Sequence, residues 1–119
     1  EITYGDWSSD VCSSDLVALH LGKTAMSPQV MAAFAHAYPF METAGDVVMS
    51  WLLLWRATIA AEKLDNGAKK KDAAFYEGQL KSAEFFANCM LPITLGKMNA
   101  ILATSSEAVD ISEDAFGGK

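Results

Sequence analysis

The side chains that could do chemistry in this sequence are its histidines, its cysteines, one pair of carboxylates and one run of lysines. His20 and His36 lie far apart, and neither stands at a metal-ligand spacing from Cys, Asp or Glu. We interpret His36, in an Ala-rich stretch, as a packed or hydrogen-bonded histidine, with a role as a base as the alternative. Cys89 has no neighbouring His or Lys to stabilise a thiolate, so we expect a buried, unreactive thiol.

Glu42 and Asp46 lie one helical turn apart, and two carboxylates at this spacing could share a proton or bind a cation. The alternative is a solvated face or a partner for Arg56. The sequence contains no glycine-rich phosphate loop, and the cluster Lys69–Lys71 is too small for a nucleic-acid surface. We expect the methionines to fill gaps in the core: Met26, Met31, Met41, Met49, Met90 and Met98. The sequence therefore assigns no catalytic, no cofactor-binding and no metal-ligating residue.

The opening segment contains the near-duplicate "GDWSSDVCSSDL", which has neither strand nor helix periodicity. It could be an acidic loop, or Ser and Asp capping a following helix. A third interpretation is favoured, because back-translation of Asp6–Leu16 gives one frame of a common sequencing-library adapter. We therefore interpret residues 1–16 as a non-native cloning or assembly segment, expect it to be disordered, and exclude it from the fold.

This exclusion changes the bulk properties. The segment holds four of the 15 acidic residues and no basic one, so the other 103 residues carry 9 basic and 11 acidic side chains, a net charge of −2. That length suits one domain with a modest core. One cysteine remains, which cannot form an intramolecular disulfide, and no signal peptide is visible. We therefore expect a cytoplasmic protein.

The most apolar stretch is Val47–Ala61, "VVMSWLLLWRATIAA". Arg56 interrupts it, acidic residues flank it, and it is shorter than the roughly 20 residues of a membrane-spanning helix. We therefore expect no membrane span. A helix that is apolar nearly all round must be buried on several sides. Because few helices are available here, we expect an upstream domain or another subunit to cover Trp51 or Trp55.

The pattern along the chain predicts an all-α fold. Val17–Met26 resembles the end of a helix, and Ser27 with Pro28 resembles the start of the next. Pro39 should kink or break that helix near Tyr38.

Two long helices are then expected, at about 40–64 and 73–103. Gly67 can take the left-handed conformation that stops the first, and Pro92 should kink the second. Glu77 and Lys81 are spaced for an ion pair on the polar face of the second helix. The expected fold is thus an antiparallel bundle of about three to four helices, two of them long and proline-kinked. Residues 17–103 form the domain, and residues 104–119 form a flexible tail.

The stretches "AGDVVMSWLLLWRATIAA" and "FYEGQLKSAEFFANCMLPITLGKMNAIL" are similar to the C-terminal helical extension found in one branch of acyl-CoA dehydrogenases. The resemblance covers most of Val17–Ala103. The residues that carry it are Gly45, Trp51, Trp55, Phe75, Tyr76, Glu77, Leu80, Ala83, Phe85, Phe86, Leu91 and Pro92.

This resemblance implies an FAD enzyme that forms a double bond between Cα and Cβ of an acyl-CoA, using a glutamate base and hydride transfer to the flavin. Base and flavin contacts would lie upstream, so no numbered residue here takes those roles and this chain alone should bind no FAD. The implied partners are the upstream dehydrogenase domain, the acyl-CoA substrate and further copies in a homo-oligomer. The alternatives are a free-standing helical interaction protein and a DNA-associated flavoprotein relative, although we expect no nucleic-acid partner.

Overall fold

The computed structural model describes the backbone of residues 4–117 and the side chains of residues 12–117. Every regular element in that part of the chain is helical, as the sequence predicts. The elements, in order, are α1 (Tyr4–Ala25), α2 (Val30–Ala35), α3 (Ala37–Asp65), α4 (Lys70–Phe85), the π-helix η1 (Phe86–Met90), α5 (Leu91–Ala103), α6 (Glu107–Asp110) and α7 (Glu113–Gly117).

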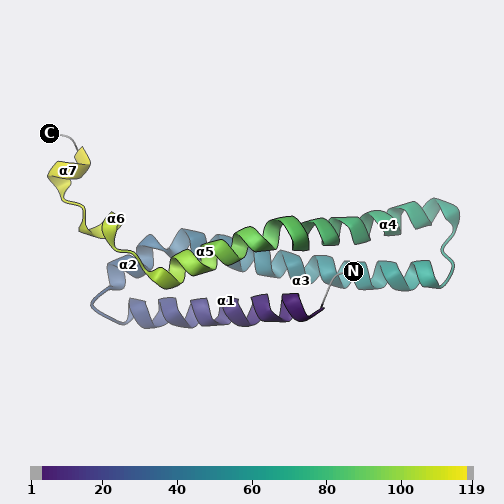
Figure 1. Ribbon diagram of the computed structural model, residues 1–119, viewed down its shortest axis with the longest axis horizontal. Helices are drawn as coiled ribbons and strands as arrows, with labels where there is room; N and C mark the ends of the chain where they lie inside the picture. The colour runs from purple at the N-terminus through teal and green to yellow at the C-terminus, as the bar shows by residue number, and fades with distance from the viewer. Residues whose placement is uncertain (1–3, 118–119) are drawn as a thin grey trace.

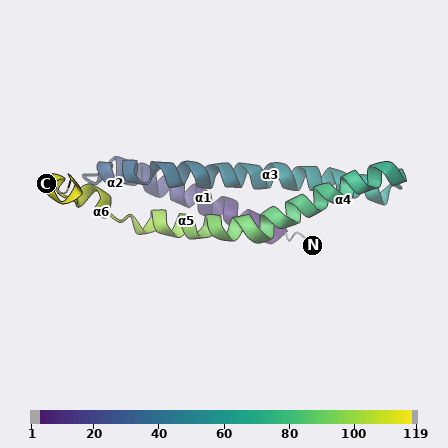
Figure 2. The ribbon, with the colours of Figure 1, turned by 90° about the horizontal axis from the view of Figure 1, so that it is seen from above.

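Two long antiparallel rods make up most of the molecule. One rod is α3, and the other is the nearly continuous run of α4, η1 and α5 (Figure 1). Helix α1 lies against α3 and α5 along part of their length. In Figure 2, α1 and α5 lie on one side of α3, and α4 crosses α3 near the tip of the hairpin. The resulting body is long and thin, with extents of 67 × 31 × 16 Å.

The core lies at the end of the molecule where α1, α2, the first half of α3 and α5 converge. Its members are Val17, Leu21, Ala33, Met98 and Ile101, with Phe40 and Val47 packed against them. Beyond α1, only α3 and α4 contact each other, and there the buried side chains are small: Ala57, Ala60 and Ala83. The far half of the hairpin is therefore held by close helix contact without a thick apolar interior.

The break between α2 and α3 falls at His36, two residues before the predicted position near Tyr38. Pro39 lies in the first turn of α3. Backbone N–H groups of the first turn have no partner within the helix, so a proline costs little there and need not break it. At the start of α2, Ser27 accepts a hydrogen bond from Gln29 N at 3.1 Å, but the helix begins only at Val30.

The second rod changes its winding just before Pro92. The π-helix spans Phe86–Met90, and Pro92 stands in the first turn of α5. Pro92 has no N–H to offer the carbonyl of Asn88, four residues earlier, and its ring would clash with that carbonyl in a regular α-helix. The wider π turn accommodates the proline without ending the rod.

Other sequence expectations have mixed outcomes. Gly67 has φ +78°, the predicted left-handed stop after α3. The predicted Glu77–Lys81 pair is wrong: Lys81 Nζ instead lies 2.7 Å from Glu84 Oε2. The second rod begins at Lys70, earlier than the expected residue 73.

The two end segments are helical where they are described. Helix α1 begins at Tyr4, so residues 4–16 form its first turns and the expected disorder is absent from them. Residues 1–3 lie outside the described part. The expected flexible tail contains the short helices α6 and α7, whose side chains are largely exposed, and residues 118–119 lie outside the described part. The origin of residues 1–16 remains a prediction.

Candidate functional site

Glu42 and Asp46, the paired carboxylates of α3, face α5. Asp46 Oδ2 accepts a hydrogen bond from Thr94 Oγ1 at 2.8 Å, and Glu42 Oε2 lies 3.3 Å from Lys97 Nζ. The interpretation of Arg56 as their partner is therefore wrong. Because each carboxylate has its own partner on α5, the pair forms a polar clamp between the two helices.

A cation site would need further ligands around these carboxylates. Within the described residues, no group of three or more His, Cys, Asp or Glu side chains lies close enough to hold a metal ion. Thr94 is 1 % exposed, so its hydroxyl has little access to water and depends on Asp46 and on the Met90 carbonyl, 3.3 Å away. The clamp therefore fixes the register of α5 against α3.

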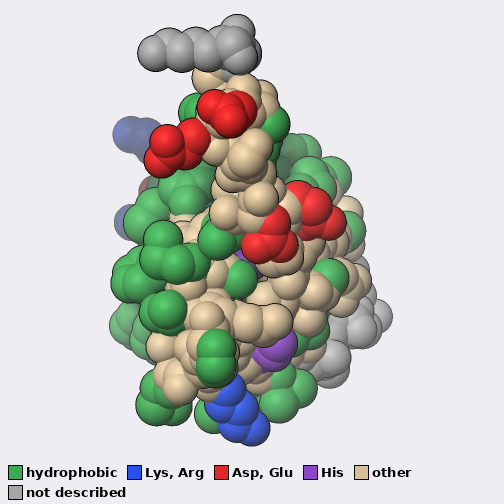
Figure 3. Space-filling view, turned by 90° about the vertical axis from the view of Figure 1, so that its left-hand side faces the viewer, with side chains coloured by type: hydrophobic (Ala, Val, Ile, Leu, Met, Phe, Trp, Pro, Cys, Tyr) green, Lys and Arg blue, Asp and Glu red, His purple; other side chains and the backbone are tan. Residues whose placement is uncertain are grey.

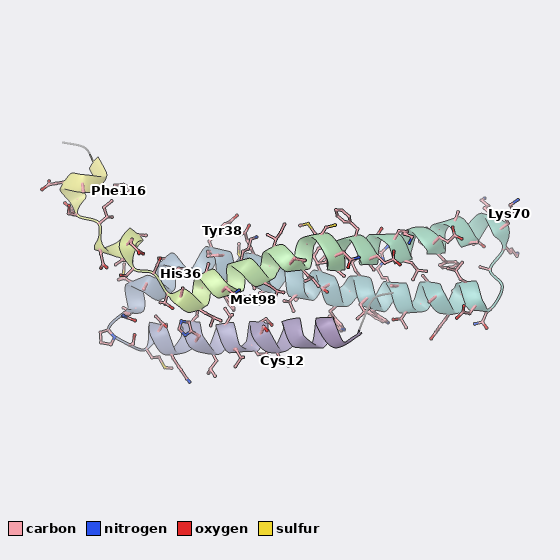
Figure 4. All side chains as sticks on the ribbon, in the orientation of Figure 1. Cys12, His36, Tyr38, Lys70, Met98 and Phe116 are labelled. Carbon is pink, nitrogen blue, oxygen red and sulfur yellow. The ribbon has the colours of Figure 1, made fainter. Side chains whose placement is uncertain are left out.

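Both histidines contact the junction that follows α5. His20 Nε2 meets the hydroxyl of Thr104, and His36 Nε2 donates to the Ser105 carbonyl oxygen at 3.1 Å. Thr104 has the left-handed φ of 49°, which turns the chain away from α5. The interpretation of His36, labelled in Figure 4, as a hydrogen-bonded histidine is confirmed. Together the two rings anchor the start of the tail.

Cys89 is exposed, so the prediction of a buried thiol is wrong. Cys89 and Met90 lie in the π-helix, and Met90 is exposed as well. A π turn holds more residues than an α turn, which rotates the following side chains relative to a regular helical pattern. The inward face of the rod therefore passes from the buried Ala83 and the half-buried Phe86 to the buried Leu91, and it leaves Cys89 and Met90 exposed.

The methionines and lysines also differ from expectation. Met98 is buried in the core, but the other five methionines are exposed, so the prediction of gap-filling methionines holds for one of six. Lys69–Lys71 lie at the tip of the α3–α4 hairpin, where Figure 4 labels Lys70. Figure 3 shows the opposite end of the molecule, where hydrophobic side chains reach the surface and the tail adds acidic ones.

The tryptophans of α3 form the most distinctive exposed feature. The indoles of Trp51 and Trp55 stack with centroids 6.4 Å apart at 17°, and the two residues are 51 % and 58 % exposed. The prediction that the chain's own helices leave a tryptophan uncovered is confirmed. Stacked indoles on a surface are typical of an interaction site.

The length argument against a membrane span does not hold, because α3 has 29 residues. Both α3 and the run Lys70–Ala103 are long and apolar enough to cross a membrane, by length and composition alone. This is weak evidence for a span, because core helices of soluble proteins have the same length and composition.

Comparison with known proteins identifies the family to which this sequence is related. The profile of the family described as "Acetyl-CoA dehydrogenase C-terminal like" matches residues 13–112. The chain is 34 % identical over 77 residues to the broad-specificity linear acyl-CoA dehydrogenase FadE5 of Mycobacterium tuberculosis, which is 65 % of this chain and 13 % of that protein.

Two butyryl-CoA dehydrogenases of Syntrophomonas wolfei are also similar. One is 31 % identical over 93 residues, covering 77 % of this chain and 15 % of the relative. The other is 29 % identical over 104 residues, covering 87 % and 17 %. The chain thus spans less than a fifth of the length of these relatives. It belongs to the acetyl-CoA dehydrogenase C-terminal-like family, the C-terminal domain of acyl-CoA dehydrogenases.

Proposed function

We propose that this chain is the C-terminal packing domain of an FAD-dependent acyl-CoA dehydrogenase and that it docks on an upstream dehydrogenase domain of the same polypeptide. The family match and the three dehydrogenase relatives support this role. Because the matched segment is less than a fifth of each relative, the catalytic machinery would lie in the other part of the enzyme.

The observation that carries the proposal is the exposure of several large apolar side chains along the second rod. Phe75, Phe85, Ile93 and Leu95 are all exposed on α4 and α5. A body 16 Å thick has room for little more than one layer of helices and cannot fold over these side chains. Large apolar side chains in this number mark a surface that is covered in the working protein.

In the whole enzyme, the flavin would accept the hydride while a glutamate base of the upstream domain removes the α-proton of the acyl-CoA. We assign no residue of this chain to either role. The buried hydroxyls of Thr24, Thr43 and Thr94 each have a partner within the protein. The contribution of this chain is mechanical: a rigid helical hairpin, fixed by its core and its polar clamp, presents an apolar surface to the dehydrogenase body. We place the enzyme in the cytoplasm.

The docking role can be tested in the intact enzyme with Phe85→Ser and Ile93→Ser. Both residues are exposed in this chain, so the domain should still fold while its attachment weakens. We expect the single thermal unfolding transition to split into two and the link between the domains to become sensitive to protease. Phe116→Ser, on the exposed helix α7, is the matched control and should have no effect. Variants that behave like this control would overturn the docking role of this surface.

Two further observations separate the alternatives. This chain alone should retain no FAD after gel filtration and reduce no dye with any acyl-CoA, and either activity would contradict a purely structural role. The codons upstream of Val17 in the source DNA should encode a dehydrogenase domain. A start codon there would instead favour a free-standing helical interaction protein.

A further inference from the structure

Helix α3 carries an apolar stripe on the side that faces away from the rest of the molecule. Its positions are 41, 45, 48, 52, 55 and 59, and all are exposed: Met41, Gly45, Val48, Leu52, Trp55 and Ile59. The opposite side of the helix holds the buried Thr43, Ser50 and Ala57. In Figure 2, α1 and α5 lie on one side of α3 and leave its outer edge free, until α4 crosses α3 near the tip of the hairpin.

The spacing of the stripe is 4, 3, 4, 3 and 4 residues. This alternation is the heptad pattern, which keeps one face of a helix in register with one other helix. Positions 41, 48 and 55 take the d role, and positions 45, 52 and 59 take the a role. The stripe is about 27 Å long at 1.5 Å per residue. Its width and period therefore fit a single partner helix.

We infer that the partner is α3 of a second copy of this chain, packed antiparallel about a two-fold axis near Ser50. The six positions are symmetric about residue 50, so in an antiparallel pair each a position meets a d position of the other copy. Val48 then packs on Leu52 of the second copy, and Met41 packs on Ile59.

The largest side chain of the stripe meets the smallest. In this register, Trp55 of one copy lies opposite Gly45 of the other. A Cβ at Gly45 would touch nothing within 4 Å in the single chain, so nothing inside the fold requires a glycine there. Glycine is an unfavourable residue in the middle of a helix. The indole of a second copy supplies the close approach that explains it.

The charges beside the stripe follow the same symmetry. Glu42 and Arg56 flank it on one side, and in the antiparallel pair Glu42 of each copy lies beside Arg56 of the other. Arg56 has no ion pair among the described side chains, residues 12–117, whereas Glu42 pairs with Lys97 at 3.3 Å. The pairing would place Glu42 between two cations. On the other flank, the two Trp51 side chains meet near the axis.

This size and charge complementarity distinguishes a second copy from the other possible occupants, a lipid surface or a helix of the dehydrogenase body. The inference goes beyond the proposed function, because docking on the body uses α4 and α5 whereas this pairing uses the free edge of α3. One helix seam buries much less than the roughly 800 Å² per partner of a standard interface. We therefore expect association of this chain alone in the micromolar range.

A charge-swap experiment on this chain tests the pairing by sedimentation over a range of concentrations. The pair has two contacts between position 42 of one copy and position 56 of the other, which we call the rim pairs. Arg56→Glu places two glutamates side by side in each rim pair, and Glu42→Arg places two arginines there. Each variant should associate about tenfold more weakly than the parent, since both rim pairs become repulsive. Mixed one to one, the two variants restore both opposite-charge contacts, so association should return to the parent level.

Two further experiments test whether loss of association can occur without loss of folding, and whether the two helices pair in the antiparallel orientation. Val48→Glu places a charge in the centre of the exposed stripe, so it should abolish association while leaving helicity intact. In a Cys12→Ser, Cys89→Ser background, a short bismaleimide should cross-link Met49→Cys, near the axis, but not Lys63→Cys on the same flank.

Four results would overturn the inference: a parent that stays monomeric throughout, association that ignores both charge changes, a mixture that does not recover, or cross-linking at Lys63→Cys. Binding of the monomer to phosphatidylcholine vesicles without self-association would point to lipid as the occupant and would also overturn it. The outcome of the docking test on Phe85 and Ile93 does not depend on any of these results.

Discussion

The hydroxyl of Thr94 on α5 donates a 2.8 Å hydrogen bond to the carboxylate of Asp46 on α3. These residues lie 48 positions apart, so the bond joins the two rods directly. We expect Thr94→Val to lower the free energy of unfolding by about 2 kcal/mol, because a bond to a charged group is lost at a buried position. Urea denaturation measures this change.

The matched control for this bond is Thr58→Val. Thr58 is exposed, and its hydroxyl bonds only to the Leu54 carbonyl of its own helix. It should change stability by less than about 0.5 kcal/mol. Equal effects of the two substitutions would show that the α3–α5 clamp contributes nothing to the free energy of unfolding.

The core depends on Met98, which is 2 % exposed and packs among residues from α1 and α2. Met98→Ala leaves a cavity in a small cluster and should cost about 2–5 kcal/mol. Met49→Ala removes the same side chain from an exposed site on α3 and should cost little in the monomer. Both should be measured at low protein concentration, and a small loss for Met98→Ala would place the stabilising contacts elsewhere.

The sequence predicts the helices well because each depends on local signals. The glycine stop at Gly67 is an example, since a left-handed residue is needed wherever the chain leaves α3. The effects of the two prolines on the helices were harder to predict. Pro39 and Pro92 both lie in first turns, where a proline is tolerated, and Pro92 is accommodated by a π turn that no periodic pattern reveals.

The candidate site was predicted only in part, for a different reason. Glu42 and Asp46 could be placed on one helix from their spacing, but their partners come from α5. Which residues of two antiparallel helices meet depends on their register, and a single sequence does not encode that register locally. Arg56 was the nearest cation along the chain, yet it is exposed and forms no ion pair with the described side chains, residues 12–117.

The role of the first residues can be tested by two deletions. Removing residues 1–16 takes away the first turns of α1 but leaves Val17, which is fully buried, and Leu21, which is 8 % exposed. We expect a change of less than about 1 kcal/mol, a few degrees in melting temperature. Removing residues 1–21 also removes both core side chains and should unfold the end held by α1. A large loss from the shorter deletion would show that residues 1–16 belong to the native fold.

The exposed pair of Lys81 and Glu84 provides a test by pH. A hydrogen bond from Lys81 lowers the pKa of the Glu84 carboxyl. A lowered pKa in the folded state means that the pair stabilises the protein above the unfolded pKa of the carboxyl and loses that effect as pH falls through the folded value. Because the bond between the two groups lies at the protein surface, the effect on stability should be small.

Lys81→Met should therefore raise the pKa of Glu84 towards its usual value, as followed by NMR titration. Lys71→Met, on the same helix but at its start, is the control and should leave the Glu84 titration unchanged. An unchanged Glu84 pKa in Lys81→Met would show that the pair does not form in solution.

Tryptophan fluorescence tests the exposed surface of α3. Trp7→Phe leaves Trp51 and Trp55 as the only indoles, and both are about half exposed in the single chain. At low concentration, acrylamide should quench them strongly, because about half of each side chain is open to water. At high concentration quenching should fall, since pairing of two α3 helices buries Trp55 against Gly45 and brings the Trp51 side chains together. Val48→Glu, which blocks pairing, should keep the strong quenching at every concentration. Full shielding of both tryptophans in a monomer would mean that the chain covers this surface itself, and α3 would then have no free edge on which a partner could dock.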